Sequence, residues 1–213
     1  MKISQQFQQQ TDPLCNLKEE NLDNIFQNVT DVVDERITTF ENGPLTKTVL
    51  VIGSSNMRGM AQRLNKQGIT ATGTIHSGAP TQQITSEIKK SDAVNILKSP
   101  PTYIVLHSGG IDARNHNNPV NKILRQMDTL IDTVKDKYKK SKLLITGLST
   151  EVGSSSLKEK IMDINKGLIR ICAAETNSCY IDCSIQSLKD SIHFSEHSKD
   201  LIARHVCDYT KSV

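Results

Sequence analysis

The sequence of 213 residues has no tryptophan and only four phenylalanines and four tyrosines. So few aromatic rings leave few platforms on which the bases of single-stranded nucleic acid can stack. No apolar run approaches the ~18 residues that a membrane-spanning helix needs. The N-terminus is polar and rich in glutamine, without the apolar core of a signal peptide. These absences predict a cytoplasmic protein with no transmembrane segment.

Cysteine is too scarce and too irregularly spaced for a structural framework. The five cysteines are an odd number, and none belongs to a C-x-x-C pair with metal-ligand spacing. We therefore expect Cys179 and Cys183, which flank a β-rich run, to be small buried or half-buried side chains rather than disulfide partners.

Charge is mild overall, with a formal net charge of +3, but it is uneven along the chain. Residues 1–46 carry 3 basic and 8 acidic side chains, whereas residues 47–213 carry 23 basic and 15 acidic ones. This asymmetry predicts a polar tail and helical extension over residues 1–45 and one globular domain over residues 46–213. The basic excess of the second part is too small to indicate nucleic-acid binding by itself.

The extension has apolar residues at helical spacing between residues 17 and 40. One interpretation is a helix packed on the main domain. The other is a short oligomerisation helix, because the apolar positions from Leu22 to Val32 also fit a heptad before Arg36 interrupts it.

From residue 47 onward, strand-like apolar runs alternate with amphipathic segments. Strands are expected at residues 47–53, 69–75, 102–108, 142–148 and 178–183. Helices are expected at residues 56–67, 81–98, 119–140, 157–176 and 194–213, with a polar loop at 109–118. The alternation predicts an α/β fold, a three-layer α/β/α sandwich around a five-stranded, mostly parallel sheet. Ligands of such sheets bind beyond the carboxyl ends of the strands, so these segments are the places to look for chemistry.

The segment after the first strand is residues 53–59, GSSNMRG. A serine at this turn exposes its hydroxyl at the sheet edge, with its backbone N–H directed at any anion that forms nearby. Taken alone, Ser54 or Ser55 is equally explained as the N-cap of the following helix. The segment lacks the Lys-Ser/Thr ending of a P-loop and the second glycine of the dinucleotide-binding pattern.

The segment before the closing helix places Asp190 three residues ahead of His193. At this spacing the carboxylate can accept a hydrogen bond from the imidazole and fix its tautomer. A histidine held in this way can take the proton of a serine hydroxyl. By itself, a D-x-x-H pattern also arises by chance on a protein surface.

Together these segments resemble the SGNH, or GDSL-like, hydrolase superfamily over about residues 48 to 206. The family's first block, Gly-Asp-Ser-x-x-x-Gly, corresponds to residues 53–59 and implies that Ser55 is the nucleophile. Its fifth block, Asp-x-x-His, implies that His193 is the general base and Asp190 its orienting acid. The resemblance implies the flavodoxin-like fold of this superfamily and a serine esterase that hydrolyses short-acyl or acetyl esters through an acyl-enzyme. It implies no metal and no organic cofactor.

The oxyanion hole departs from the family pattern. The second block implies that the N–H groups of Gly78 and Ser55 hold the oxyanion. The third block, Gly-x-Asn-Asp, falls on residues 109–112 and puts Ile111 at the position of the asparagine. Isoleucine cannot donate a hydrogen bond, and losing one such donor costs about 10²–10³ in rate. Ser54 also replaces the aspartate of the first block. We therefore predict a slow esterase.

A finer resemblance concerns residues 105–114, 142–148 and 157–168 (VLHSGGIDAR, KLLITGL and LKEKIMDINKGL). They resemble the esterase domains of the first-frame proteins of animal LINE-type retroelements. The alternative function is accordingly a catalytically impaired binding or assembly module for a retroelement ribonucleoprotein or a lipid surface. The expected partners are a small ester substrate, then nucleic acid or a lipid surface, and a second copy of the chain through residues 17–40.

Overall fold

The computed structural model describes residues 47–90, 100–190 and 192–212. The predicted extension over residues 1–45, with its helix at 17–40, lies outside the described residues, and so does the end of the helix predicted at 81–98. Among the helices of the described ranges, none combines the length and the apolar composition needed to span a bilayer.

Five parallel strands form one sheet in the order β2-β1-β3-β4-β5. The strands are β1 (Thr48–Gly53), β2 (Thr70–Ile75), β3 (Tyr103–His107), β4 (Lys142–Thr146) and β5 (Ser178–Ile181). Each residue of β1 and β3 is buried, as their continuous apolar runs require, whereas the edge strand β2 is partly exposed. The predicted α/β fold with a parallel sheet is confirmed.

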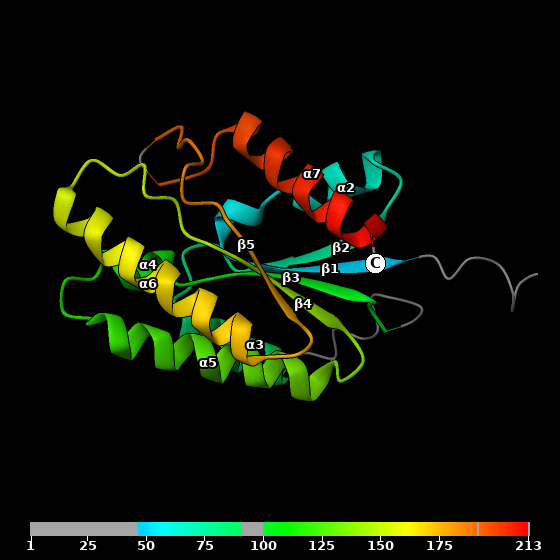
Figure 1. The fold of residues 1–213 in the computed structure, drawn as a ribbon, viewed down its shortest axis with the longest axis horizontal. Helices are drawn as coiled ribbons and strands as arrows, with labels where there is room; N and C mark the ends of the chain where they lie inside the picture. The colour runs from blue at the N-terminus through cyan, green and yellow to red at the C-terminus, as the bar shows by residue number, and fades with distance from the viewer. Residues whose placement is uncertain (1–46, 91–99, 191, 213) are drawn as a thin grey trace, which may run out of the picture. The chain divides into compact units, whose positions relative to one another are not determined.

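Helices cover both faces of this sheet (Figure 1). They are the 3₁₀ helix η1 (Ser55–Met57), α2 (Met60–Lys66), α3 (Thr81–Lys90), α4 (Gly110–Arg114), α5 (Val120–Lys137), α6 (Ser155–Ala174) and α7 (Glu196–Ser212). One buried core joins α3, α5 and α6 to one face of the sheet. A second core joins α2 and α7 to the other face.

The strand order reverses direction between β1 and β3. The chain leaves β1 for its neighbour β2 on one side and returns to β3 on the other. The segments that follow β1 and β3 therefore diverge, and ligands bind at this point in sheets of this kind. The turn after β1 carries Ser55, so this topology places it at the edge where chemistry is expected.

Three predicted segments are corrected by the structure. The helix predicted at 56–67 is two helices, η1 and α2, because Gly59 adopts a left-handed conformation with φ of +80° between them. The loop predicted at 109–118 contains α4, whose five residues are too few to give a helical pattern in the sequence. The closing helix begins at Glu196, later than predicted, because the Ser195 hydroxyl accepts the N–H of Ser198 and caps it.

The cysteines of the described ranges form no disulfide. Cys183 is buried, Cys179 is half-buried, and both are free thiols. Burial raises the pKa of Cys183 to about 12, so this thiol stays protonated at neutral pH.

Candidate active site

The turn that carries Ser55 approaches β3 closely. The Ser54 N–H donates to the carbonyl of His107, the last residue of β3, at 3.1 Å. A Cβ atom on Gly53 would lie 2.8 Å from that same carbonyl oxygen and 2.9 Å from Cγ of Met57. Only glycine permits this approach, which presents Ser55 at the carboxyl edge of the sheet.

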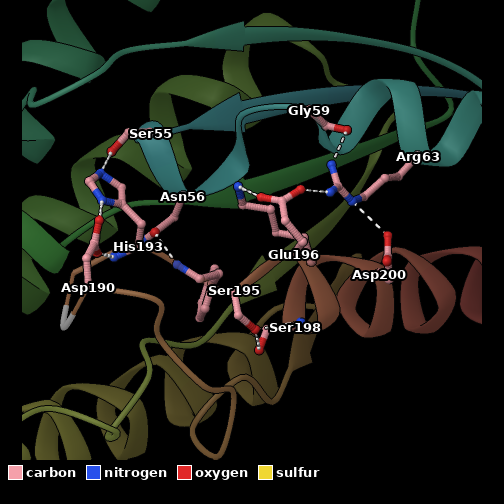
Figure 2. A network of polar contacts seen from close by, with 12 residues as sticks. Ser55, Asn56, Gly59, Arg63, Asp190, His193, Ser195, Glu196, Ser198 and Asp200 are labelled. Carbon is pink, nitrogen blue, oxygen red and sulfur yellow. Dashed lines mark hydrogen bonds and ion pairs between the residues drawn. The ribbon is translucent and has the colours of Figure 1, made fainter.

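The structure brings Ser55, His193 and Asp190 together (Figure 2). Oγ of Ser55 lies 3.1 Å from Nε2 of His193, although the two residues are 138 positions apart in the sequence. Nδ1 of His193 lies 2.9 Å from Oδ2 of Asp190. When Nδ1–H donates to the carboxylate, Nε2 is left unprotonated and can accept the Ser55 hydroxyl proton.

Asp190 is held in its charged form mainly by backbone groups. Its Oδ1 accepts the N–H of His193 at 2.8 Å and that of Ile192 at 3.2 Å. The His193 N–H, followed by the bond from the His193 ring, lowers the pKa of Asp190 to about 2. Its side chain is 46% exposed, so the carboxylate faces both the imidazole and solvent.

The loop that presents Asp190 and His193 is closed at its base. The Lys189 N–H donates to the carbonyl of His193 at 2.9 Å. Below this contact, the hydroxyls of three serines lie 2.8–3.1 Å from one another. The three are Ser187, Ser195 and Ser198. These short connections make the loop a defined turn directly ahead of α7.

A charged network joins the helix after Ser55 to the helix after His193 (Figure 2). Arg63 of α2 donates to the carbonyl of Gly59 at 3.2 Å and to Oδ1 of Asp200 of α7 at 2.8 Å. It also forms an ion pair with Glu196, which is paired with Lys199 at 3.0 Å. The network therefore connects the two segments whose meeting creates the Ser55–His193 contact.

Gly78, the predicted second oxyanion donor, lies in the turn after β2. It has a left-handed φ of +70°, and Ala79 N–H closes the turn onto the carbonyl of His76 at 3.3 Å. Arg58, from the Ser55 turn, donates to Oγ of the neighbouring Ser77 at 2.7 Å and so connects the two turns. Among the described residues, neither the Ser55 N–H nor the Gly78 N–H donates to a backbone carbonyl in the turns, loops and helix caps. The role of Gly78 stays a prediction.

The third block has a structural role that the sequence analysis missed. Asp112 is buried, and its Oδ2 accepts the Thr81 N–H at 2.9 Å and the Thr81 hydroxyl at 2.7 Å. It thereby caps α3, which begins just after the Gly78 turn. Its neighbour Ile111 is 37% exposed on α4 and offers no polar group.

The sequence analysis also missed a buried polar group behind Ser55. His107 is 1% exposed, and its Nδ1 lies 2.8 Å from Oγ1 of Thr146 in β4. Its Nε2 lies 3.4 Å from Nδ2 of Asn56, the residue that follows Ser55. The available signal was a histidine near the end of the largely apolar run TYIVLHS.

Burial lowers the pKa of His107 to about 4 and predicts a pH-dependent stability. In the unfolded chain the same imidazole titrates near its ordinary pKa of about 6.5. Between these values the unfolded state binds a proton that the folded state excludes. The free energy of unfolding is therefore expected to fall as the pH drops through this window, by up to about 3 kcal/mol, and to be fully recovered above it.

Urea unfolding of wild type and His107→Gln at a series of pH values from 7.5 to 4 checks this expectation. The variant lacks the titrating group, so its unfolding free energy is expected to depend less steeply on pH in this window. Parallel curves for the two proteins would contradict the prediction.

The sequence matches no model of a protein family and no curated protein, but the fold matches solved structures. A member of the lipolytic G-D-S-L family from Veillonella parvula superimposes with a TM-score of 0.65 and 16% identity, over 78% of this chain and 100% of that one. A GDSL-like lipase from Bacteroides thetaiotaomicron gives 0.59 and 15% over 84% and 98%. A family 3 carbohydrate esterase from Clostridium thermocellum gives 0.59 and 18% over 78% and 96%. The chain therefore has the α/β fold of GDSL/SGNH hydrolases.

Proposed function

We propose that this protein is a serine esterase that hydrolyses short-acyl carboxylic esters, acetyl esters in particular. One observation carries the proposal: Ser55, His193 and Asp190 form a continuous series of contacts of 3.1 and 2.9 Å at the carboxyl edge of the sheet. This is the arrangement of a Ser-His-Asp triad. The fold of this chain is shared with lipolytic proteins and a carbohydrate esterase, and this likeness supports ester hydrolysis as the reaction class.

In the proposed reaction, Oγ of Ser55 attacks the ester carbonyl while Nε2 of His193 takes the hydroxyl proton. The carbonyl oxygen becomes an oxyanion, which the N–H groups of Ser55 and Gly78 stabilise. The C–O bond to the alcohol breaks, and His193 returns its proton to the leaving alkoxide. A water molecule, deprotonated by His193, then hydrolyses the acyl-enzyme to the free acid and restores Ser55. Asp190 stabilises the imidazolium in both halves.

A small cavity lies beside the turn that carries Ser55. This cavity, beside Asn56 and His107 and lined also by Arg114, Leu148 and Ile192, has a volume of only ≈ 10 Å³. This is about the space of one water molecule. Neither Ser55 nor His193 lines this cavity, so its size does not limit the length of the acyl group.

The test is hydrolysis of p-nitrophenyl acetate together with fluorophosphonate labelling read by mass spectrometry. We expect turnover and a single labelled peptide whose modified residue is Ser55. A protein that neither turns over the ester nor takes the label is not a serine esterase.

Ile111→Asn is expected to raise kcat for p-nitrophenyl acetate by about 10-fold or more, because it restores an amide donor where the family has one. Removing such a donor elsewhere costs about 10²–10³ in rate. Ile111→Ala, which shortens the side chain without adding a donor, is the matched control. Equal rates in the two variants would show that the position does not face the oxyanion.

A second candidate function rests on Ile111. A chain that lacks the oxyanion asparagine is also suited to serve as a catalytically impaired binding or assembly module, for a retroelement ribonucleoprotein or a lipid surface. Filter binding to a single-stranded RNA over a series of salt concentrations tests it. A steep loss of affinity with salt, in a protein without esterase activity, favours this candidate over the esterase.

A further inference from the structure

A series of polar contacts runs from the His193 segment through the residue next to Ser55 into the centre of the sheet. The N–H of Phe194 donates to Oδ1 of Asn56 at 3.0 Å. Nδ2 of Asn56 lies 3.4 Å from Nε2 of His107. Nδ1 of His107 lies 2.8 Å from Oγ1 of Thr146, whose hydroxyl lies 3.2 Å from the Leu106 carbonyl.

The chemistry of these groups fixes the direction of every bond in the series. A backbone N–H can only donate, so Oδ1 of Asn56 faces Phe194 and the amide Nδ2 faces His107. Nε2 of His107 must then accept, and the proton lies on Nδ1. That proton is donated to Thr146, which in turn gives its own to the Leu106 carbonyl. One arrangement of protons satisfies all of the groups.

The series lies in the interior, where a broken link is expensive. His107 and Thr146 are each 1% exposed. A buried donor or acceptor that loses its partner costs about 1–3 kcal/mol. Phe194 is itself fully buried, and its ring packs on the His107 ring with 5.5 Å between centroids. Phe194 is therefore held to the sheet by its backbone through Asn56 and by its ring through His107.

We infer that Asn56 is a positioning residue of the proposed esterase: it joins the Ser55 turn to the His193 segment and so sets the Ser55–His193 distance. Asn56 directly follows Ser55, and Phe194 directly follows His193, so the Asn56–Phe194 bond lies one residue from each partner of the 3.1 Å contact (Figure 2). His107 keeps the Asn56 amide in the one orientation that offers Oδ1 to Phe194. The expected effect of Asn56 on catalysis rests on the proposed function, whereas its contacts with Phe194 and His107 do not.

The test compares Asn56→Ala, Asn56→Asp and wild type, with Asn121→Ala, an exposed asparagine of α5, as the matched control. Steady-state hydrolysis of p-nitrophenyl acetate gives kcat and KM. Nitrogen-15 NMR of the histidine rings gives the tautomer of His107 and the environment of His193. Circular dichroism confirms that each variant is folded.

We expect wild-type His107 to be the neutral Nδ1–H tautomer. Asn56→Ala is expected to lower kcat by about 10- to 100-fold with KM within about twofold, because a small misplacement of reacting groups is enough for such a loss. It is also expected to move the ring signals of both His107 and His193. Asn56→Asp keeps an acceptor for Phe194 but has no donor for Nε2, so His107 is expected to leave the Nδ1–H form.

An Nε2–H tautomer in wild type would overturn the inference. So would a folded Asn56→Ala whose His193 signals and kcat are those of wild type. The ring signals are read whether or not the protein hydrolyses esters. If Ser55→Ala shows that the proposed function is wrong, unchanged His193 signals in Asn56→Ala still overturn the positioning role and shifted ones support it.

Discussion

Ser55→Ala is expected to lower kcat for p-nitrophenyl acetate by at least about 10⁴-fold, because removal of the nucleophile from a Ser-His-Asp triad leaves only the residual catalysis of the oxyanion hole and of binding. The Ser55 hydroxyl is 3.1 Å from Nε2 of His193, so it has the base that a serine needs to attack a carbonyl. Stopped-flow measurement of the p-nitrophenol burst, with the steady-state rate, checks both the acylation and the turnover.

Ser54→Ala is the matched control for this variant. Ser54 is the neighbouring residue in the same turn, but it is buried and its side chain makes no cap to the helix that follows. We expect Ser54→Ala to keep the fluorophosphonate label on Ser55. A label that persists in Ser55→Ala and disappears in Ser54→Ala would show that Ser54, and not Ser55, is the nucleophile.

Asp190→Asn is expected to lower kcat by about 10²–10⁴-fold, the upper value being that of a buried triad aspartate. The carboxylate accepts the His193 Nδ1–H at 2.9 Å. An asparagine in its place can turn its amide N–H₂ toward Nδ1 and stabilise the tautomer in which Nε2 carries the proton. That tautomer cannot accept the Ser55 proton. Solvent reaches half of Asp190, which moderates the loss relative to a fully buried acid.

Asp208→Asn, which changes an exposed aspartate on α7, is the control for the lost charge. The backbone N–H of His193, followed by the His193 ring, lowers the pKa of Asp190 to about 2, and this value predicts how activity depends on pH. Its carboxylate stays charged throughout the range from pH 5 to 8, so we expect the pH profile of kcat/KM in that range to owe nothing to Asp190. An Asp190→Asn enzyme as fast as wild type would mean that another group orients His193.

The sequence was informative wherever chemistry depends on residues close together in the chain. The Asp190–His193 spacing predicted a hydrogen bond that the structure has at 2.9 Å, because three residues are enough to turn a carboxylate onto an imidazole. Continuous apolar runs predicted β1, β3 and β4, because a strand covered on both faces has few polar positions. Both inferences use interactions within a few residues.

The residues that sequence reasoning missed act over long distances. Asp112 entered the sequence analysis only as the last residue of the third block, but its role as the cap of α3 depends on Thr81, 31 positions away. Asn56 looked like any helix residue. Its role comes from contacts with His107 and Phe194, 51 and 138 positions away. No pattern along the chain marks such pairs, since their partners are chosen by the packing of the elements.

By itself, the sequence determined the parallel α/β architecture and predicted Ser55, His193 and Asp190 as the candidate site. It did so because hydrophobic period and residue type are properties of the chain. Only the tertiary structure decided that Ser55 and His193 lie 3.1 Å apart, that the helix after Ser55 breaks at Gly59, and which buried groups support the contact. Those outcomes follow from the strand order, the close approach of β1 and β3 at Gly53, and the need of every buried polar group for a partner.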